Sequence, residues 1–325
     1  MTRPSLASPS LARRFAGLAA AALAAIFAAP FATATPAGAG QTYPALFVFG
    51  DSLSDAGNAW LATNFAEPIS PPYFFGRFTN GRVWAQDLAI ALNLPRLTPS
   101  RAGGRDYAVG GAQSGTTVVH SANPSDLPAQ LASFATKAPH PRKGALYALW
   151  IGANDLSAIL ADSATLGVAG VQGAVAQVVA NEVYAIATLH AAGAENFLVL
   201  TIPDLGKVPA VTALGPVASA DASQLVAAFN TALVGAMTQE AAALRVKMTF
   251  VDTYALIDAA VADPKAYGFT DVTTPCWTGN YTSATSGTLC SIGWYRQNDH
   301  LFWDHMHPTA AGHAQVAKAV EAVLP

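Results

Sequence analysis

The sequence is poor in charge and in cysteine. Only 11% of its 325 residues are Asp, Glu, Lys or Arg, whereas 52% are hydrophobic, and the formal net charge is −3. Without a basic stripe to meet phosphates, a nucleic-acid partner is not expected. The two cysteines, Cys276 and Cys290, lack the second, suitably spaced pair that a structural zinc site needs. In an exported chain such a pair predicts a disulfide that closes a loop and contributes roughly 3 kcal/mol.

The segment 1–34 has the composition of a secretory signal peptide. Arg3, Arg13 and Arg14 precede an apolar run rich in Ala, Leu and Phe, and small residues follow it. Small-x-small sites allow cleavage near residue 34 or as late as residue 39. The apolar run is about 15 residues long, shorter than the roughly 20 that span a membrane. We therefore expect a secreted or periplasmic protein, exported by the general route or, because of the paired arginines, by the twin-arginine route.

The rest of the chain, 43–325, is predicted to form one domain, because it contains no linker, repeat or low-complexity run. Buried-strand patterns alternate with helical patterns along its whole length. This alternation predicts an α/β fold, a three-layer doubly wound parallel sheet with helices on both faces. The predicted strands are 46–49, 145–151, 196–201 and 248–252, and the predicted helices are 82–92, 126–137, 168–192, 216–244 and 308–323.

Two of the predicted strands end abruptly in polar, glycine-containing turns. The first is followed by Gly50, Asp51 and Ser52, and the second by 152–155, which includes Asn154. The carboxyl ends of parallel strands meet at one edge of a sheet, so these turns are expected to lie together. A hydroxyl carried where a core strand ends is held rigidly yet can be reached by substrate. Ser52 is therefore the candidate nucleophile of a serine hydrolase.

A serine nucleophile needs a base, and the base needs a group that orients it. Asp304 and His307 are three positions apart, a spacing that places two side chains on the same side of one helical turn. In a serine hydrolase His307 would take the Ser52 proton through one ring nitrogen while Asp304 accepts a hydrogen bond from the other. A lone D-x-x-H match is more often a helix cap or a surface pair, so the spacing by itself leaves both interpretations open. The glycine-rich segment 103–115 is either a candidate donor loop, because glycine lets backbone N–H groups approach a ligand closely, or an ordinary surface turn.

Two segments of the chain have no regular helix or strand pattern, 67–81 and 263–300. The loop 67–81 is rich in Pro, Gly and aromatic residues, and its aromatic side chains either line a pocket or pack the loop onto the body. These side chains are Tyr73, Phe74, Phe75 and Phe78. The excursion 263–300 contains both cysteines, and loops of that length are usually functional or stapled.

Four blocks resemble the GDSL or SGNH hydrolase family, and they occur in that family's order. The blocks are 50–58, which begins GDSL, then 108–112, 152–155 and 304–309. The resemblance implies an SGNH-hydrolase, flavodoxin-like fold, with Ser52 as nucleophile, His307 as base and Asp304 as its orienting acid. It also implies an oxyanion hole made by the backbone N–H groups of Ser52 and Gly111 and the side-chain amide of Asn154.

One position departs from the family pattern, since Asp106 stands where members often carry Asn. Segments 71–73, 76–84 and 302–303 further resemble the branch of secreted bacterial lipases, phospholipases and lipid acyltransferases. We therefore expect a lipid or other hydrophobic ester as substrate, transient contact with a membrane or lipid surface, no cofactor and no obligate protein partner. Acyl transfer to another alcohol is the alternative to hydrolysis.

Three other interpretations compete with this one. The ordinary α/β-hydrolase elbow is excluded, because no G-x-S-x-G occurs in the chain. A metal-dependent hydrolase would use Asp304, His305, His307 and His313, but it leaves the Ser52 block unexplained. A secreted binding protein with a degraded site conflicts with the complete set of site residues. Asp51 and Asp155 adjoin site positions and are expected to brace the loops.

Overall fold

The computed structural model describes residues 42–138 and 142–325, so the predicted signal segment lies outside the described residues. In this part of the chain the regular strands form one parallel sheet in the order β1-β2-β3-β4. The strands are β1 (Leu46–Gly50), β2 (Leu146–Trp150), β3 (Asn196–Leu200) and β4 (Lys247–Val251). Every residue of β1, β2 and β3 is buried, which explains why these strands are continuous apolar runs.

A short extended segment, 105–109, lies along the free side of β1. The Val48 N–H donates to the Arg105 carbonyl at 3.1 Å, and the Tyr107 N–H donates to the Val48 carbonyl at 2.7 Å. The chain therefore leaves β1 toward one side of the sheet and returns to place β2 on the other. This reversal makes the sheet doubly wound and puts the switch point, where α/β proteins bind ligands, at the carboxyl ends of β1 and β2.

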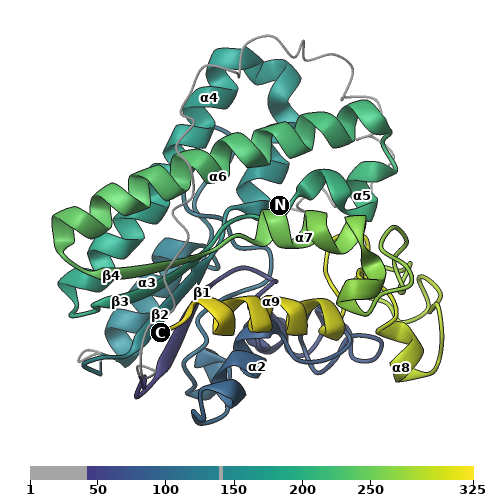
Figure 1. The fold of residues 1–325 in the computed structure, drawn as a ribbon, viewed down its shortest axis with the longest axis horizontal. Helices are drawn as coiled ribbons and strands as arrows, with labels where there is room; N and C mark the ends of the chain where they lie inside the picture. Colours follow the sequence, from purple (N-terminus) through teal and green to yellow (C-terminus); the bar gives the residue numbers. More distant parts are fainter. Residues whose placement is uncertain (1–41, 139–141) are drawn as a thin grey trace.

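Helices cover both faces of the sheet, which confirms the predicted three-layer α/β fold (Figure 1). On one face α2 (Trp84–Ala91) packs against α9 (Ala310–Val323). The other face carries α3 (Leu127–Lys137), α4 (Ala153–Ala191) and α6 (Pro216–Leu244). The shorter helices are α1 (Asn58–Ala62), α5 (Pro209–Thr212), α7 (Thr253–Ala262) and α8 (Trp294–Gln297), with 3-10 turns η2 (Ser100–Ala102), η3 (Leu205–Lys207) and η4 (Pro264–Tyr267).

Helix α4 starts earlier than its sequence pattern indicates. It begins at Ala153, directly after β2, and its backbone leaves the helical conformation at Gly167, so two helical segments follow one another. The predicted helix 168–192 corresponds to the second segment alone. The first was missed because its opening residues are polar, although Asp155 in a first turn suits the helix dipole. Among the described helices, α4 alone has the length and hydropathy to cross a membrane; it packs against α6.

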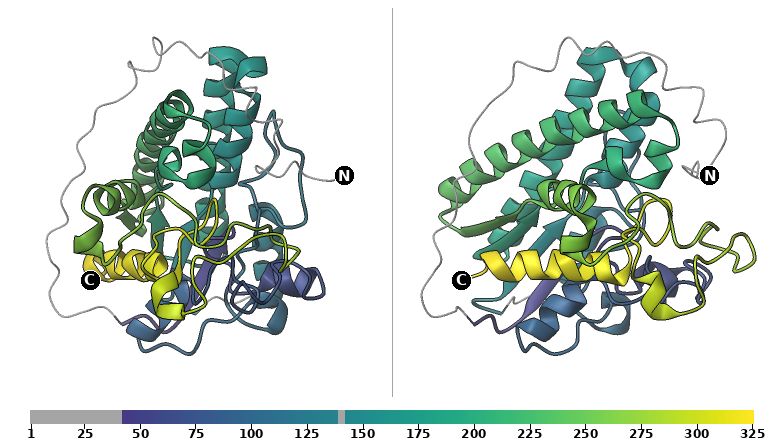
Figure 2. Two further views of the ribbon diagram at one scale, coloured as in Figure 1. Left: turned by 90° about the vertical axis from the view of Figure 1, so that its right-hand side faces the viewer. Right: turned by 45° about the vertical axis from the view of Figure 1, so that its right-hand side comes forward.

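The excursion between η4 and α9 is mostly irregular, and a disulfide joins Cys276 to Cys290 within it. Figure 2 shows these loops, in yellow-green, beyond one end of α9. The Ile69 N–H donates to the Tyr281 carbonyl at 2.7 Å, which ties the excursion to the aromatic loop 67–81. Two segments that are far apart in sequence thus close over the same end of the sheet.

Candidate active site

Ser52, His307 and Asp304 lie together in one hydrogen-bonded chain. His307 Nε2 is 2.7 Å from Ser52 Oγ, and His307 Nδ1 is 2.9 Å from Asp304 Oδ2. The three side chains are buried, with exposed fractions of 8%, 7% and 2% in the order Ser52, His307 and Asp304. A carboxylate can only accept, so Nδ1 carries the proton and Nε2 is the acceptor that faces the serine hydroxyl. The arrangement can remove a proton from Ser52.

The turn that presents Ser52 is held from two sides. Gln130 of α3 accepts the Gly50 N–H at 3.0 Å and donates to the Gly50 carbonyl at 2.7 Å. Asp51 braces the same turn by accepting the Leu53 N–H at 2.9 Å. A Cβ at Gly50 would lie 2.2 Å from the Trp150 carbonyl oxygen, so glycine is required where β1 ends. Sequence reasoning missed Gln130, whose only signal is a polar residue inside an amphipathic helix.

Asp304 and His307 meet in an irregular turn, so their expected placement on a helical turn is wrong. Helix α9 begins only at Ala310, with Thr309 as its N-cap. Asp304 Oδ1 accepts the backbone N–H groups of Met306 and His307, each at 2.8 Å. The carboxylate therefore builds the turn in the manner of an Asx turn, and this turn brings the imidazole back against it.

The environment keeps Asp304 ionised. Burial alone would raise the pKa of its carboxyl, but the His307 imidazole and the N–H groups of Met306 and His307 outweigh burial and hold that pKa below its usual value. A negative charge next to Nδ1 stabilises the imidazolium that forms when His307 takes a proton.

The residues predicted to form the oxyanion hole lie on adjoining loops. Gly111 has a positive φ of 73°, and Asn154 donates through Nδ2 to the Ala112 carbonyl at 2.9 Å. The Gly110 N–H donates to Asp55 Oδ2 at 2.8 Å, so it belongs to the loop framework. The roles of Gly111 and Asn154 as oxyanion donors stay predictions.

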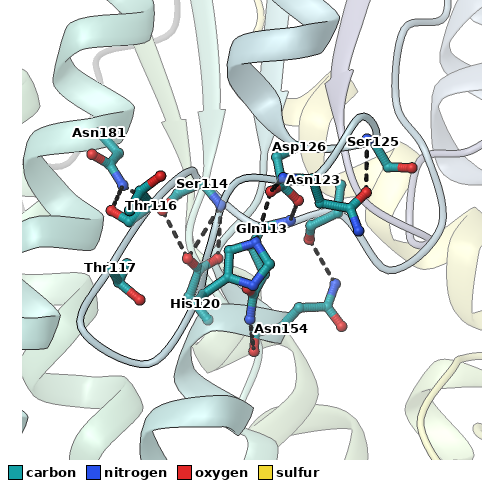
Figure 3. A network of polar contacts seen from close by, with 12 residues as sticks. Gln113, Ser114, Thr116, Thr117, His120, Asn123, Ser125, Asp126, Asn154 and Asn181 are labelled. Carbon is teal, nitrogen blue, oxygen red and sulfur yellow. Dashed lines mark hydrogen bonds and ion pairs between the residues drawn. The ribbon is translucent and has the colours of Figure 1, made fainter. Parts of the chain in front are cut away.

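A polar network behind the glycine loop fixes that loop to α3 and α4 (Figure 3). The Ser114 side chain donates to Asp155 at 2.8 Å, and the Ser114 N–H donates to the same carboxylate at 2.9 Å. The Gln113 N–H donates to Asp126, which also contacts His120 Nε2 at 2.7 Å. Asp155 thus braces the loop, as expected from its place beside Asn154.

Asp106 uses both carboxylate oxygens where the family often has Asn. One oxygen accepts the Ala56 N–H and the other the Ala108 N–H, so it joins the nucleophile turn to the extended segment 105–109. Burial, and then the charge of Asp55, raise the pKa of the Asp106 carboxyl well above its usual value. A carboxyl group at this position therefore accepts the backbone N–H groups of both Ala56 and Ala108.

Aromatic side chains surround the imidazole of His307. The ring centroids of Phe78 and Tyr281 lie 5.3 and 5.8 Å from that of His307. The Tyr73 hydroxyl donates to Asp304 at 2.9 Å. Phe75, by contrast, is 59% exposed. Tyr73 and Phe78 therefore pack the loop onto the body beside the imidazole, and the alternative that the aromatic side chains line a pocket stays a prediction.

The arrangement of His307 does not suit the metal-site alternative. Its two ring nitrogens face Ser52 and Asp304, which leaves neither directed toward a site shared with His305 or His313. Burial lowers the pKa of His313 to about 3, so this histidine is neutral inside α9. No cluster of three or more His, Cys, Asp or Glu groups suited to a metal occurs in 42–138 or 142–325.

Comparison with known proteins assigns this sequence to a family. The sequence profile of GDSL-like lipase/acylhydrolases matches residues 46–320. The thermolabile hemolysin of Vibrio parahaemolyticus is 28% identical over 83% of this chain, a match that spans 61% of the hemolysin's length. The phosphatidylcholine-sterol acyltransferase of Aeromonas hydrophila is 26% identical over 84% of this chain and 88% of its own length. GDSL esterase/lipase 5 of Arabidopsis thaliana is 27% identical over 85% of this chain and 82% of its own length. The chain therefore belongs to the GDSL lipase/acylhydrolase family.

Proposed function

We propose that the protein is a secreted serine esterase or lipase. Its substrates are carboxylic esters, either lipids or other hydrophobic acyl esters. The observation that carries this proposal is the continuous relay from Ser52 Oγ through His307 to Asp304, at 2.7 and 2.9 Å. Membership of the GDSL family supports ester chemistry. Secretion rests on the N-terminal composition of the sequence.

In the first half of the reaction Ser52 Oγ bonds to the carbonyl carbon of the ester, and its proton passes to His307 Nε2. The carbonyl oxygen becomes an oxyanion, which the N–H groups of Ser52, Gly111 and Asn154 would stabilise in the proposed reaction. When the carbon–oxygen bond to the alcohol breaks, the imidazolium returns the proton to the departing alkoxide. The products of this half are the free alcohol and an acyl group on Ser52.

In the second half water takes the place of the alcohol. His307 removes a proton from the water while the water oxygen bonds to the acyl carbon, and the Ser52 oxygen leaves with the proton that the imidazolium carries. Asp304 stays ionised throughout and balances the imidazolium charge in both halves. The acid is released and the serine is restored.

Acyl transfer is the second candidate function, because it shares the acyl-enzyme and differs only in the nucleophile that reaches it. Similarity to the Aeromonas acyltransferase over most of both chains favours this possibility. A phospholipid acyl donor would then pass its acyl group to an alcohol in place of water.

The decisive experiment replaces the nucleophile. Ser52→Ala should leave the protein folded and lower the kcat/KM for a chromogenic acyl ester by at least about a thousandfold, and His307→Ala should be comparably damaging. Ser163→Ala is the matched control, because Ser163 is equally buried at 6% exposed and donates only to the Leu160 carbonyl in α4. Near-wild-type turnover by Ser52→Ala would contradict the proposal.

Two further measurements separate the alternatives. Turnover that resists a chelator but is lost with a serine-directed inhibitor excludes a metal hydrolase. Product analysis with phospholipid, triacylglycerol and short esters, each with and without a sterol or alcohol acceptor, distinguishes hydrolysis from acyl transfer. A folded wild-type protein that turns over none of these esters would support a binding protein instead.

A further inference from the structure

The hydroxyl of Tyr73 contacts the member of the triad that is farthest from the ester. It donates to Asp304 Oδ2 at 2.9 Å, although the two residues are 231 positions apart in the sequence. Both side chains are almost fully buried, Tyr73 at 1% exposed and Asp304 at 2%. The sequence motifs assign this hydroxyl no role, since they place Tyr73 in an aromatic loop and in a segment that resembles one branch of the family.

The donors to Asp304 fall into two groups. Met306 N–H, His307 N–H and His307 Nδ1 all come from residues within three positions of Asp304. These contacts shape the turn, but because their donors belong to the same turn they do not fix the carboxylate relative to the rest of the protein. Within 42–138 and 142–325, Tyr73 is the one side chain outside this turn with a hydrogen bond to the carboxylate. Its hydroxyl therefore connects the orientation of Asp304 to the rest of the molecule.

Tyr73 is itself held rigidly. Its N–H donates to the Ile69 carbonyl at 3.2 Å, and its ring meets Trp303 edge-on with centroids 6.1 Å apart. The Tyr281 ring lies 5.7 Å away on another side. Burial, followed by the neighbouring Asp304 carboxylate, raises the pKa of Tyr73 above its usual value, so the phenol keeps its proton and acts as a donor.

We infer that Tyr73 is a positioning residue for the ester hydrolysis proposed above, on which this inference rests. Its hydroxyl holds the Asp304 carboxylate toward His307 Nδ1, so that Nε2 stays directed at Ser52. A hydrogen bond to a charged group is among the stronger ones, and small errors in the orientation of a catalytic base are costly. Because Tyr73 acts through Asp304 on the base, its loss should lower kcat and leave KM nearly unchanged.

The first test removes the hydroxyl and keeps the ring. Tyr73→Phe should lower kcat roughly tenfold, with KM within about twofold of wild type. Tyr147→Phe is the matched control, because Tyr147 is also 1% exposed but its hydroxyl has no hydrogen-bond partner among the described residues. That control should keep wild-type kinetics. A Tyr73→Phe protein with wild-type kcat overturns the inference.

A double-mutant cycle asks whether Tyr73 acts through Asp304. In an Asp304→Ala background the hydroxyl has no carboxylate to orient, so adding Tyr73→Phe should cause no further loss of kcat. A general effect of Tyr73 on packing would instead lower kcat by the same factor in both backgrounds. Equal factors in the two backgrounds therefore overturn the inference.

A spectroscopic test does not need turnover. The proton on His307 Nδ1 is shared with Asp304, and its NMR resonance reports that hydrogen bond. Tyr73→Phe should shift this resonance, and Tyr147→Phe should leave it unchanged. An unshifted resonance in Tyr73→Phe overturns the inference. This test does not depend on whether Asp304→Ala folds. If the wild-type protein hydrolyses no ester, the proposed function fails while this resonance still tests the contact.

Discussion

The carboxylate of Asp55 accepts the backbone N–H of Gly110 at 2.8 Å and so joins the turn that carries the nucleophile to the glycine loop. The same carboxylate accepts the N–H groups of Gly57, Asn58 and Ala59. Asp55 is fully buried, and burial raises the pKa of its carboxyl although four N–H groups donate to it. One side chain therefore satisfies donors from two segments of the site.

Replacing Asp55 with Ala should destabilise the protein strongly. Four backbone N–H groups would be left without this acceptor, so we expect the free energy of unfolding to fall by at least about 3 kcal/mol and turnover to fall with it. Asp252→Ala is the control, because Asp252 accepts a single N–H, that of Ala255, at the start of α7. Its loss should cost about 1 kcal/mol with little change in activity. Urea denaturation and ester turnover measure both effects, and equal costs for the two variants would contradict the prediction.

Gly110→Ala should disturb the site through Phe78. A Cβ at Gly110 would lie 2.2 and 2.4 Å from two ring carbons of Phe78, the ring that packs on His307. Because a buried ring cannot yield like a flexible chain, we expect a loss of about 1–3 kcal/mol in stability and a several-fold lower kcat. Differential scanning calorimetry and steady-state kinetics check this.

Gly173→Ala is the corresponding control for the glycine substitution. Its added Cβ meets nothing within 4 Å in helix α4. Alanine is the better helix former, so the variant should be as stable as the wild type or more stable, with unchanged kcat. Identical behaviour of Gly110→Ala and Gly173→Ala would show that Phe78 is free to move aside.

The carboxyl of Asp155 should make stability depend on pH. Burial raises its pKa from 3.8 to about 7, although Ser114 donates two hydrogen bonds to it. The folded protein thus holds this proton more tightly than the unfolded chain. The resulting stability is fully present below about pH 4 and is lost as the pH rises through 7, a change on the order of 4 kcal/mol at most.

Asp155→Asn tests this, because Asn cannot ionise yet keeps an acceptor oxygen for Ser114. The free energy of unfolding of the variant, measured in urea from pH 4 to 8, should decline less than that of the wild type. Asp162→Asn, on the same helix but only partly buried, should follow the wild-type curve. If the Asp155→Asn curve runs parallel to the wild-type curve, the burial argument is wrong.

The disulfide should matter more for stability than for chemistry. Replacing both Cys276 and Cys290 with Ser opens the loop that carries Tyr281 and should lower the free energy of unfolding by roughly 3 kcal/mol. We expect the fall in kcat at 25 °C to be less than about tenfold, because the disulfide joins two residues of the excursion and supplies none of the groups in the Ser52–His307–Asp304 relay. Thermal denaturation with and without a reductant is the check: reductant should lower the Tm of the wild type and leave that of the double variant unchanged. A catalytic loss larger than the stability loss would give the loop a direct role.

Local patterns in the sequence predicted much of this structure. Apolar runs indicated β1, β2 and β3 within a residue or two, because strands buried on both faces have no polar face to display. Strand β4 was also located to within a residue, although most of its side chains are only partly buried. Helix α6 matches its predicted bounds, since Pro at its start is a strong local signal. The predictions for the first half of α4 and for the turn at Asp304 were wrong, because polar residues at a strand end indicate a loop and a helix start equally well.

What the sequence alone determined is the set of candidate site residues and their order along the chain, because Ser52, Asn154 and His307 each follow or precede a locally readable element. Only the tertiary structure decided how these groups are held. Segment 105–109 joins the sheet beside β1, and Tyr73 reaches Asp304 across 231 positions. Such contacts depend on which strands become neighbours and how loops close over them, and residues distant in sequence carry no local signal of that arrangement.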